Sequence, residues 1–165
     1  MGEMGKWVFR LLMIVFIVPV IQAKGQVKKL EDMRIRDPFV LTDEATGMYY
    51  LYASISNRTG NALGVEVYKS RDLENWEGPQ TVFRVPGNFW GNRMVWAPEV
   101  HVHKGKYYLF VTFTSDKKLT QAEGRPEIVN RASQVLLSDS PLGPFTPVAN
   151  QTHTPDGWLS LDASV

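Results

Sequence analysis

Apolar and polar residues alternate with a period of two along most of the chain, which predicts β-strands. Residues 64–70 (Gly-Val-Glu-Val-Tyr-Lys-Ser) alternate most regularly. Apolar runs rich in the β-branched and aromatic residues that strands prefer occupy 49–52, 107–113 and 133–138. Turn-forming residues separate these runs, for example the Asp, Ser, Pro and Gly of 139–144. Because no stretch after the N-terminal region has a sustained helical period, the pattern predicts an all-β fold.

The predicted strands and turns follow one order twice, and a third copy begins near the end of the sequence. Each copy opens with a related motif, whose equivalent residues are Asp37, Ala97 and Asp162. These residues are 60 and 65 positions apart. Sheet-forming units that repeat over such distances are typical of β-propellers, in which each blade buries its faces against its neighbours. We therefore expect Asp37 and Asp162 to point into one central channel.

Four short strands per unit give the expected blade boundaries. We expect the first blade at about 35–83, the second at about 95–148, and the first strand of a third at about 160–165. Residues 24–34 are expected to form a lead before the first blade. The polar segment 115–131 is expected to be a loop within the second blade, and such loops often carry ligand contacts.

The first 23 residues have the composition of a secretory signal peptide. Lys6 and Arg10 precede the apolar run 11–21, and the small residue Ala23 offers a cleavage position. The run is short for a membrane span, which needs about 20 apolar residues. An uncleaved membrane anchor is the alternative interpretation. We expect export to the periplasm or the extracellular space, with no membrane association after cleavage.

Composition argues against several kinds of site. The sequence has no cysteine, so neither a disulfide nor a thiol nucleophile can form. A formal net charge of +1 without a basic run argues against a nucleic-acid partner. His101 and His103 would face one side of a strand, but they lack carboxylate or thiolate neighbours at ligand spacing. We predict no metal site and no cofactor, and we expect these histidines to face solvent or to stack on neighbouring rings.

Five motifs occur in order along the chain. They are Arg36-Asp37-Pro38, the turn 70–76, Trp96-Ala97-Pro98-Glu99, the turn 138–145, and Leu161-Asp162-Ala163-Ser164. In this order and spacing they resemble glycoside hydrolase family 43, and the resemblance covers residues 35–165. It implies a five-bladed β-propeller that acts mainly on arabinose- and xylose-containing plant polysaccharides, and hence a carbohydrate partner.

The resemblance also implies roles for individual residues. Inverting hydrolysis of a glycoside uses a carboxylate that activates water and a carboxylic acid that protonates the leaving oxygen, about 6.5–9.5 Å apart. By resemblance Asp37 is the general base. Asp162 orients the acid and raises its pKa, because a nearby like charge disfavours the ionised form. The acid is a Glu in a later blade; neither Glu99 nor Glu127 occupies its motif, so we expect the acid to be absent from these 165 residues.

Each of these assignments has a structural alternative. Asp37, which precedes a proline, could be a turn residue that accepts backbone hydrogen bonds, and Asp162 could have no role of its own. Trp96 is expected to stack on the apolar face of a sugar ring, with Trp90 and Phe89 as weaker candidates for the same role. For all three rings, packing between blades is the alternative.

Together with the signal-like N-terminal region, the resemblance implies an exported glycosidase that hydrolyses O-glycosyl bonds of arabinose- or xylose-containing polysaccharides or oligosaccharides with inversion. Because the predicted acid is absent, we expect the 165 residues by themselves to be inactive. The alternative is an inactive or sugar-binding partial propeller without catalysis.

Overall fold

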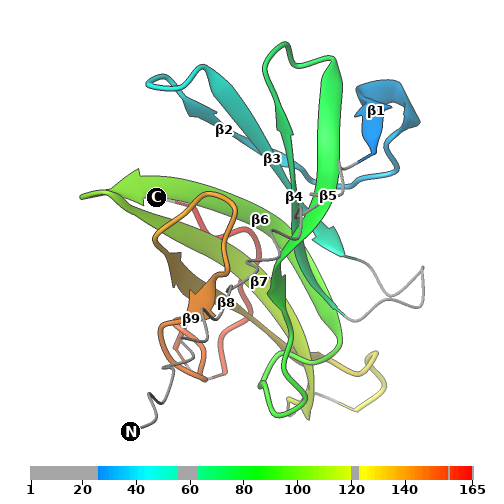
Figure 1. Cartoon of the computed structure of the whole chain (residues 1–165). Coiled ribbons are helices and arrows are strands. Elements are labelled where there is room, and N and C mark those ends of the chain that lie inside the picture. The colour runs from blue at the N-terminus through cyan, green and yellow to red at the C-terminus, as the bar shows by residue number, and fades with distance from the viewer. Residues whose placement is uncertain (1–25, 56–62, 120–122, 156, 165) are drawn as a thin grey trace, which may run out of the picture.

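The computed structural model describes residues 26–55, 63–119, 123–155 and 157–164 (Figure 1). The predicted signal peptide at 1–23 lies outside these residues. Within them there is no α-helix, so the all-β prediction is confirmed, and no helix is long and apolar enough to cross a membrane. The elements in chain order are β1 (Val27–Lys29), the 3₁₀ helix η1 (Leu30–Asp32), β2 (Phe39–Asp43), β3 (Met48–Ile55), β4 (Gly64–Ser70), β5 (Asn75–Arg84), β6 (Met94–His103), β7 (Lys106–Lys118), β8 (Val129–Ser138) and β9 (Thr146–Pro147).

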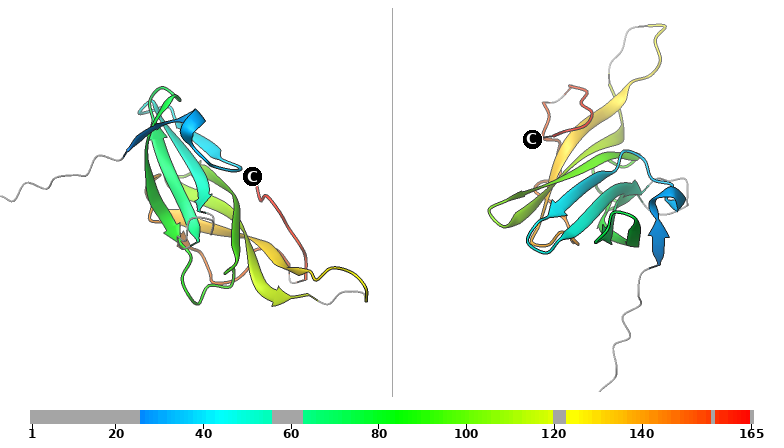
Figure 2. Two further views of the ribbon diagram at one scale, coloured as in Figure 1. Left: turned by 90° about the vertical axis from the view of Figure 1, so that its right-hand side faces the viewer. Right: turned by 90° about the horizontal axis from the view of Figure 1, so that it is seen from above.

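The strands form two antiparallel sheets that pack against each other (Figures 1 and 2). The strand orders are β1-β5-β4-β3-β2 in the first sheet and β6-β7-β8-β9 in the second. The second sheet has the four strands predicted, whereas the first has five. The extra strand β1 pairs with the outer strand β5, with Val27 opposite Glu77. Part of the expected lead at 24–34 therefore belongs to the first sheet, because it satisfies hydrogen-bonding groups that the edge of β5 would otherwise leave unpaired.

The internal repeat predicted from the sequence is visible in the register of the strands. Tyr49 pairs with Ser70 where the middle strands of the first sheet meet. Tyr107 pairs with Ser138 at the equivalent place in the second sheet. The Oγ atom of each serine accepts a hydrogen bond from the backbone N–H two residues later, at 3.2 Å for Ser70 and 3.1 Å for Ser138. The two units therefore share pairing and turn geometry as well as sequence.

The main core lies between the two sheets. It joins Tyr52, Val65, Val67 and Phe83 of the first sheet to second-sheet residues that include Val100, Leu109, Val111 and Phe113. Most of these side chains are fully buried, and full burial of one such side chain contributes about 1.5–3 kcal/mol. The core explains why the sheets stack face to face and bring their edge strands β2 and β6 together.

A smaller cluster covers the opposite face of the first sheet. Leu51, Ala53, Tyr68 and Trp76 are buried there, with Met33 and Ile35 packed against them. Strand β3 is therefore buried on both faces, which explains its uninterrupted apolar sequence.

Two segments differ from their prediction. The predicted loop at 115–131 is shorter, because β7 continues to Lys118 and β8 begins at Val129, and these two residues pair. In the second segment, residues 157–164 do not form the predicted first strand of a third unit. A strand requires a ladder of backbone partners, and this segment instead makes scattered hydrogen bonds to the second sheet.

Candidate active site

The three equivalent residues of the sequence repeat share an uncommon backbone conformation. Asp37, Ala97 and Asp162 have φ angles of 47°, 38° and 56°. The left-handed region costs an L-residue roughly 1–2 kcal/mol, although Asp tolerates it better than most. In β6 the conformation coincides with an irregularity between Trp96 and Glu99, where the register with β7 shifts. The repeated motif therefore specifies a repeated bend, which aims the side chain differently from a regular strand.

Asp37 lies immediately before β2 and its carboxylate is accessible to water. The side chain is 51% exposed, and its Oδ2 is 3.3 Å from Nε of the more exposed Arg36. An ion pair this exposed contributes little to stability. A general base must reach a water molecule, and an exposed carboxylate at a fixed bend meets that requirement.

Trp96 lies at the same corner, although it belongs to the other sheet. The Arg36 guanidinium carbon is 5.7 Å from the centre of the Trp96 ring, within the range of a cation–π contact. The indole N–H donates a 3.0 Å hydrogen bond to Oγ1 of Thr114. The ring is half-buried, so part of it remains at the surface. The structure thus brings Asp37 and Trp96 together through Arg36.

Asp162 is held by a segment that crosses the second sheet from β8 to β6. The backbone N–H of Ser160 donates to the carbonyl of Arg131 on β8 at 3.0 Å. The N–H of Asp162 then donates to Oγ1 of the fully buried Thr112 on β7, also at 3.0 Å. These two bonds fix the main chain from Ser160 to Asp162, while the side chain of Asp162 stays exposed.

Glu99 is a residue whose importance was missed from the sequence. Its Oε1 accepts a 2.8 Å hydrogen bond from Nε2 of His101 and a 2.9 Å bond from Oγ of Ser164. The signal for the first contact was present, because residues two apart in a strand share a face. The contact with Ser164 spans 65 positions, and no local pattern predicts it.

His101 packs against two neighbouring rings, in a tilted and an edge-to-face arrangement. Its ring centre lies 5.5 Å from that of Phe39 on β2 and 5.8 Å from that of Phe110 on β7. His103 is exposed, 6.3 Å from the ring of Tyr108. Within the described residues no group of three His, Asp or Glu side chains is placed to hold a metal ion.

Phe89 and Trp90 both pack in the core between the sheets, which is the structural alternative given for these rings. Phe89 is 5% exposed and lies between the rings of Phe83 and Phe113. Trp90 packs on Phe113, and its indole N–H donates to Oε1 of the buried Gln134 at 2.8 Å. Burial favours packing between blades for Phe89, whereas the role of the half-buried Trp90 in sugar stacking stays a prediction.

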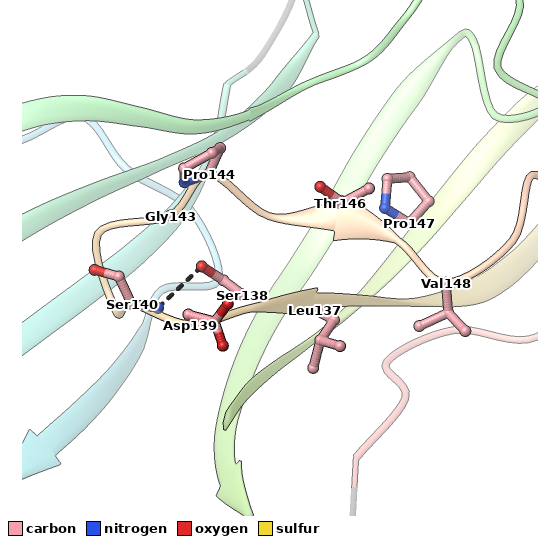
Figure 3. A pocket seen from close by; sticks show the side chains of 9 residues that line it. All are labelled: Leu137, Ser138, Asp139, Ser140, Gly143, Pro144, Thr146, Pro147 and Val148. Atoms are coloured by element: carbon pink, nitrogen blue, oxygen red, sulfur yellow. Dashed lines mark hydrogen bonds between the residues drawn. The ribbon is translucent and has the colours of Figure 1, made fainter. Parts of the chain in front are cut away.

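A hollow of about 500 Å³ lies beside the turn that closes the second unit (Figure 3). Its wall includes Pro144, Pro147 and Val148, and its carboxylate, Asp139, forms an ion pair with Lys106. None of the motif residues at Asp37, Trp96 or Asp162 lines it. The hollow therefore lacks the pair of free carboxylates that glycoside hydrolysis requires.

Comparisons with known proteins agree with the motifs. The model of the glycosyl hydrolases family 43 matches residues 31–165. An endo-arabinase structure from Bacteroides thetaiotaomicron is 39% identical, with a TM-score of 0.67. The matched region is 87% of this chain and 44% of the endo-arabinase chain. The extracellular endo-α-(1→5)-L-arabinanase 1 of Bacillus subtilis is 28% identical over 96 residues, which are 54% of this chain and 28% of that protein. The extracellular exo-α-(1→5)-L-arabinofuranosidase ArbA of Cellvibrio japonicus is 31% identical over 98 residues, which are 54% of this chain and 25% of ArbA.

The chain thus spans less than half the length of these relatives, and its two sheets are blades of a β-propeller. Because the family model matches nearly all residues after the N-terminal region, and in the order of the five motifs, the chain belongs to the glycosyl hydrolases family 43.

Proposed function

We propose that this chain supplies the water-activating part of an inverting glycosidase that hydrolyses O-glycosyl bonds of arabinose- or xylose-containing polysaccharides or oligosaccharides. The observation that carries the proposal is the exposed carboxylate of Asp37, held at a left-handed bend that recurs at Ala97 and Asp162. Family membership and relatives named as an arabinanase and an arabinofuranosidase support the reaction class and favour arabinose.

In the proposed reaction Asp37 accepts a proton from water as that water attacks the anomeric carbon. The bond to the leaving sugar breaks on the opposite face, and a carboxylic acid protonates the departing oxygen. The acid is proposed to come from a later blade, with Asp162 close enough to orient it and to raise its pKa. The exposed part of the Trp96 ring is proposed to contact the apolar face of the sugar.

The proposed reaction takes place outside the cytoplasm. The support is the signal-like composition of residues 1–23 and the word extracellular in the names of both curated relatives. Detection of the mature protein in the culture medium or periplasm, with its N-terminus at about residue 24, tests this part of the proposal.

The stereochemistry of the product tests the reaction itself. In a chain that joins residues 24–165, with β1 intact, to the remaining blades, proton nuclear magnetic resonance during early turnover should show the sugar released with inverted anomeric configuration. Release of the retained anomer would contradict the proposal, because a single attack by an Asp37-activated water inverts the centre.

A further inference from the structure

Four residues form a continuous path between the segments that carry Asp37 and Asp162. Phe39, two residues after Asp37, packs against the ring of His101, whose Nε2 donates to Glu99. The same Oε1 atom of Glu99 accepts from Ser164, two residues after Asp162. We name Phe39, His101, Glu99 and Ser164 the Glu99 bridge. It joins β2 of one sheet to the 157–164 segment that lies across the other.

The bridge is partly buried at Glu99 and His101, whereas its Ser164 end is exposed. The side chain of Glu99 is 23% exposed and that of His101 is 34% exposed, so both are partly shielded from water. A carboxylate has two oxygens with about four acceptor positions, so one oxygen can hold two donors at once. Hydrogen bonds to an ionised acceptor are about twice as strong as neutral ones. Glu99 can therefore fix His101 and Ser164 relative to each other.

We propose that Glu99 and His101 are positioning residues that set the distance and orientation between Asp37 and Asp162. The structural part of this proposal, the fixed spacing, does not depend on the proposed function. Its effect on catalysis rests on the proposed function. An inverting site needs its base and its acid held about 6.5–9.5 Å apart. Because Asp162 is proposed to orient the acid, its position relative to Asp37 affects that separation, and a change of about 1 Å can lower the rate by about 10²-fold. Within the described residues, the side chain of Asp37 makes no hydrogen bond or ion pair with the 157–164 segment, and the side chain of Asp162 makes none with β2. The Glu99 bridge is therefore the connection between the two segments.

Spin labels measure this spacing without any enzymatic activity. The chain has no cysteine, so Val40→Cys and Leu161→Cys give two unique labelling sites beside the two aspartates, at positions that are 39% and 49% exposed. Double electron–electron resonance on the whole chain gives the distribution of distances between the labels. We expect Glu99→Ala to shift or broaden this distribution, and Glu99→Gln to preserve it because the amide oxygen still accepts hydrogen bonds.

Histidine variants separate the hydrogen bond from the ring packing. His101→Phe keeps a ring against Phe39 but loses the donor to Glu99, and it should broaden the distribution. His103→Phe is the matched control, because this exposed residue lies on the same strand and takes no part in the bridge. It should leave the distribution unchanged.

In a chain that carries the remaining blades, Glu99→Ala should lower kcat by about 10²-fold with little change in KM, and Glu99→Gln should restore most of it. Three results would overturn the proposal: a Glu99→Ala distribution that superimposes on the parent, a Glu99→Gln distribution as broad as that of Glu99→Ala, or loss of the whole fold in Glu99→Ala. If the labels respond as expected but Asp37→Asn keeps full activity, the function assigned to Asp37 fails while the bridge stands.

Discussion

The hydroxyl of Tyr52 donates a 2.7 Å hydrogen bond to the carbonyl of Pro141, and this bond joins the centre of the first sheet to the closing turn of the second. Two further hydrogen bonds join the two sheets near this turn. The N–H of Phe145 donates to the carbonyl of Val82 at 2.8 Å, and the side chain of Gln80 donates to the carbonyl of Leu142 at 2.8 Å. Gly143 allows this approach, since a Cβ atom there would come within 3.0 Å of Val82. Burial raises the pKa of Tyr52, so its hydroxyl remains a donor at all ordinary pH values.

Tyr52→Phe should destabilise the folded chain, because the ring is kept but the partly buried carbonyl of Pro141 loses its donor. The expected loss in free energy of unfolding is about 1–3 kcal/mol. Urea denaturation followed by fluorescence measures it. Tyr49→Phe is the control, because the hydroxyl of Tyr49 has no hydrogen-bond partner within the described residues. Equal losses of unfolding free energy in the two variants would show that the hydrogen bond from Tyr52 to Pro141 contributes nothing.

Asp72 organises the turn between β4 and β5. Its carboxylate accepts hydrogen bonds from the side chain and backbone of Asn75, the backbone of Glu74 and the hydroxyl of Ser70, and these hold the pKa of Asp72 well below its ordinary value. A lowered folded-state pKa stabilises the fold above the ordinary aspartate pKa, and the contribution disappears as the pH falls through the lowered value.

Asp72→Ala should therefore lower the melting temperature at neutral pH, and the difference from the parent should shrink in strong acid. Asp139→Ala is the matched control in the second turn, because its carboxylate forms an exposed ion pair with Lys106. Melting curves from pH 7 to pH 2 check both variants; a deficit for Asp72→Ala that stays constant over this range would contradict the linkage.

Much of the fold was predictable from the sequence because its signals are local. Alternation and turn residues predicted the strands, and the repeated motif placed Asp37, Ala97 and Asp162 in equivalent positions, which share one backbone conformation. The pairing of β1 was not predictable, since Val27–Lys29 is too short to show a period.

Parts of the candidate site were also beyond the reach of local patterns. The bond between Glu99 and Ser164 depends on how a distant segment crosses the sheet. The roles of Phe89 and Trp90 could not be separated by residue type, because an aromatic ring suits both a core and a sugar-binding surface. In the folded chain Phe89 is buried, which favours packing, whereas Trp90 is half-buried and packs on Phe113.

Glu66 is expected to reduce stability at neutral pH. Burial raises the pKa of Glu66, and the hydroxyl of Tyr68 donates a 2.9 Å hydrogen bond to it, which partly offsets the cost. An acid whose folded-state pKa is raised stabilises the fold when protonated and loses that contribution as the pH rises through the raised value. Glu66→Gln should raise the melting temperature at pH 7 and have little effect near pH 4. A lower melting temperature at pH 7 would show that charge on Glu66 stabilises the fold.

The left-handed bend at Ala97 makes a prediction that does not depend on catalysis. Glycine relieves the cost of this conformation, roughly 1–2 kcal/mol, but it also loses more backbone entropy on folding. Ala97→Gly should therefore leave the free energy of unfolding unchanged or raise it by up to about 1 kcal/mol. Ala97→Val should lower it, because a β-branched residue is a strong outlier at positive φ. Ala45→Gly, in an exposed turn, is the control and should give no gain.

The most direct test of the proposed function compares Asp37→Asn with Asp32→Asn in a chain that joins residues 24–165, with β1 and η1 intact, to the remaining blades. Asp32 is also an exposed aspartate, but it lies in η1 outside the motif. The measurement is kcat/KM on an unactivated arabino-oligosaccharide, with binding of the same sugar measured by calorimetry. Asp37→Asn should lower kcat/KM by at least about 10²–10⁴-fold while binding is largely kept, because a positioned proton acceptor contributes this much. Asp32→Asn should match the parent. An Asp37→Asn variant with kcat/KM within about tenfold of the parent would contradict the assignment of Asp37 as the general base, because the loss would be far smaller than a general base contributes.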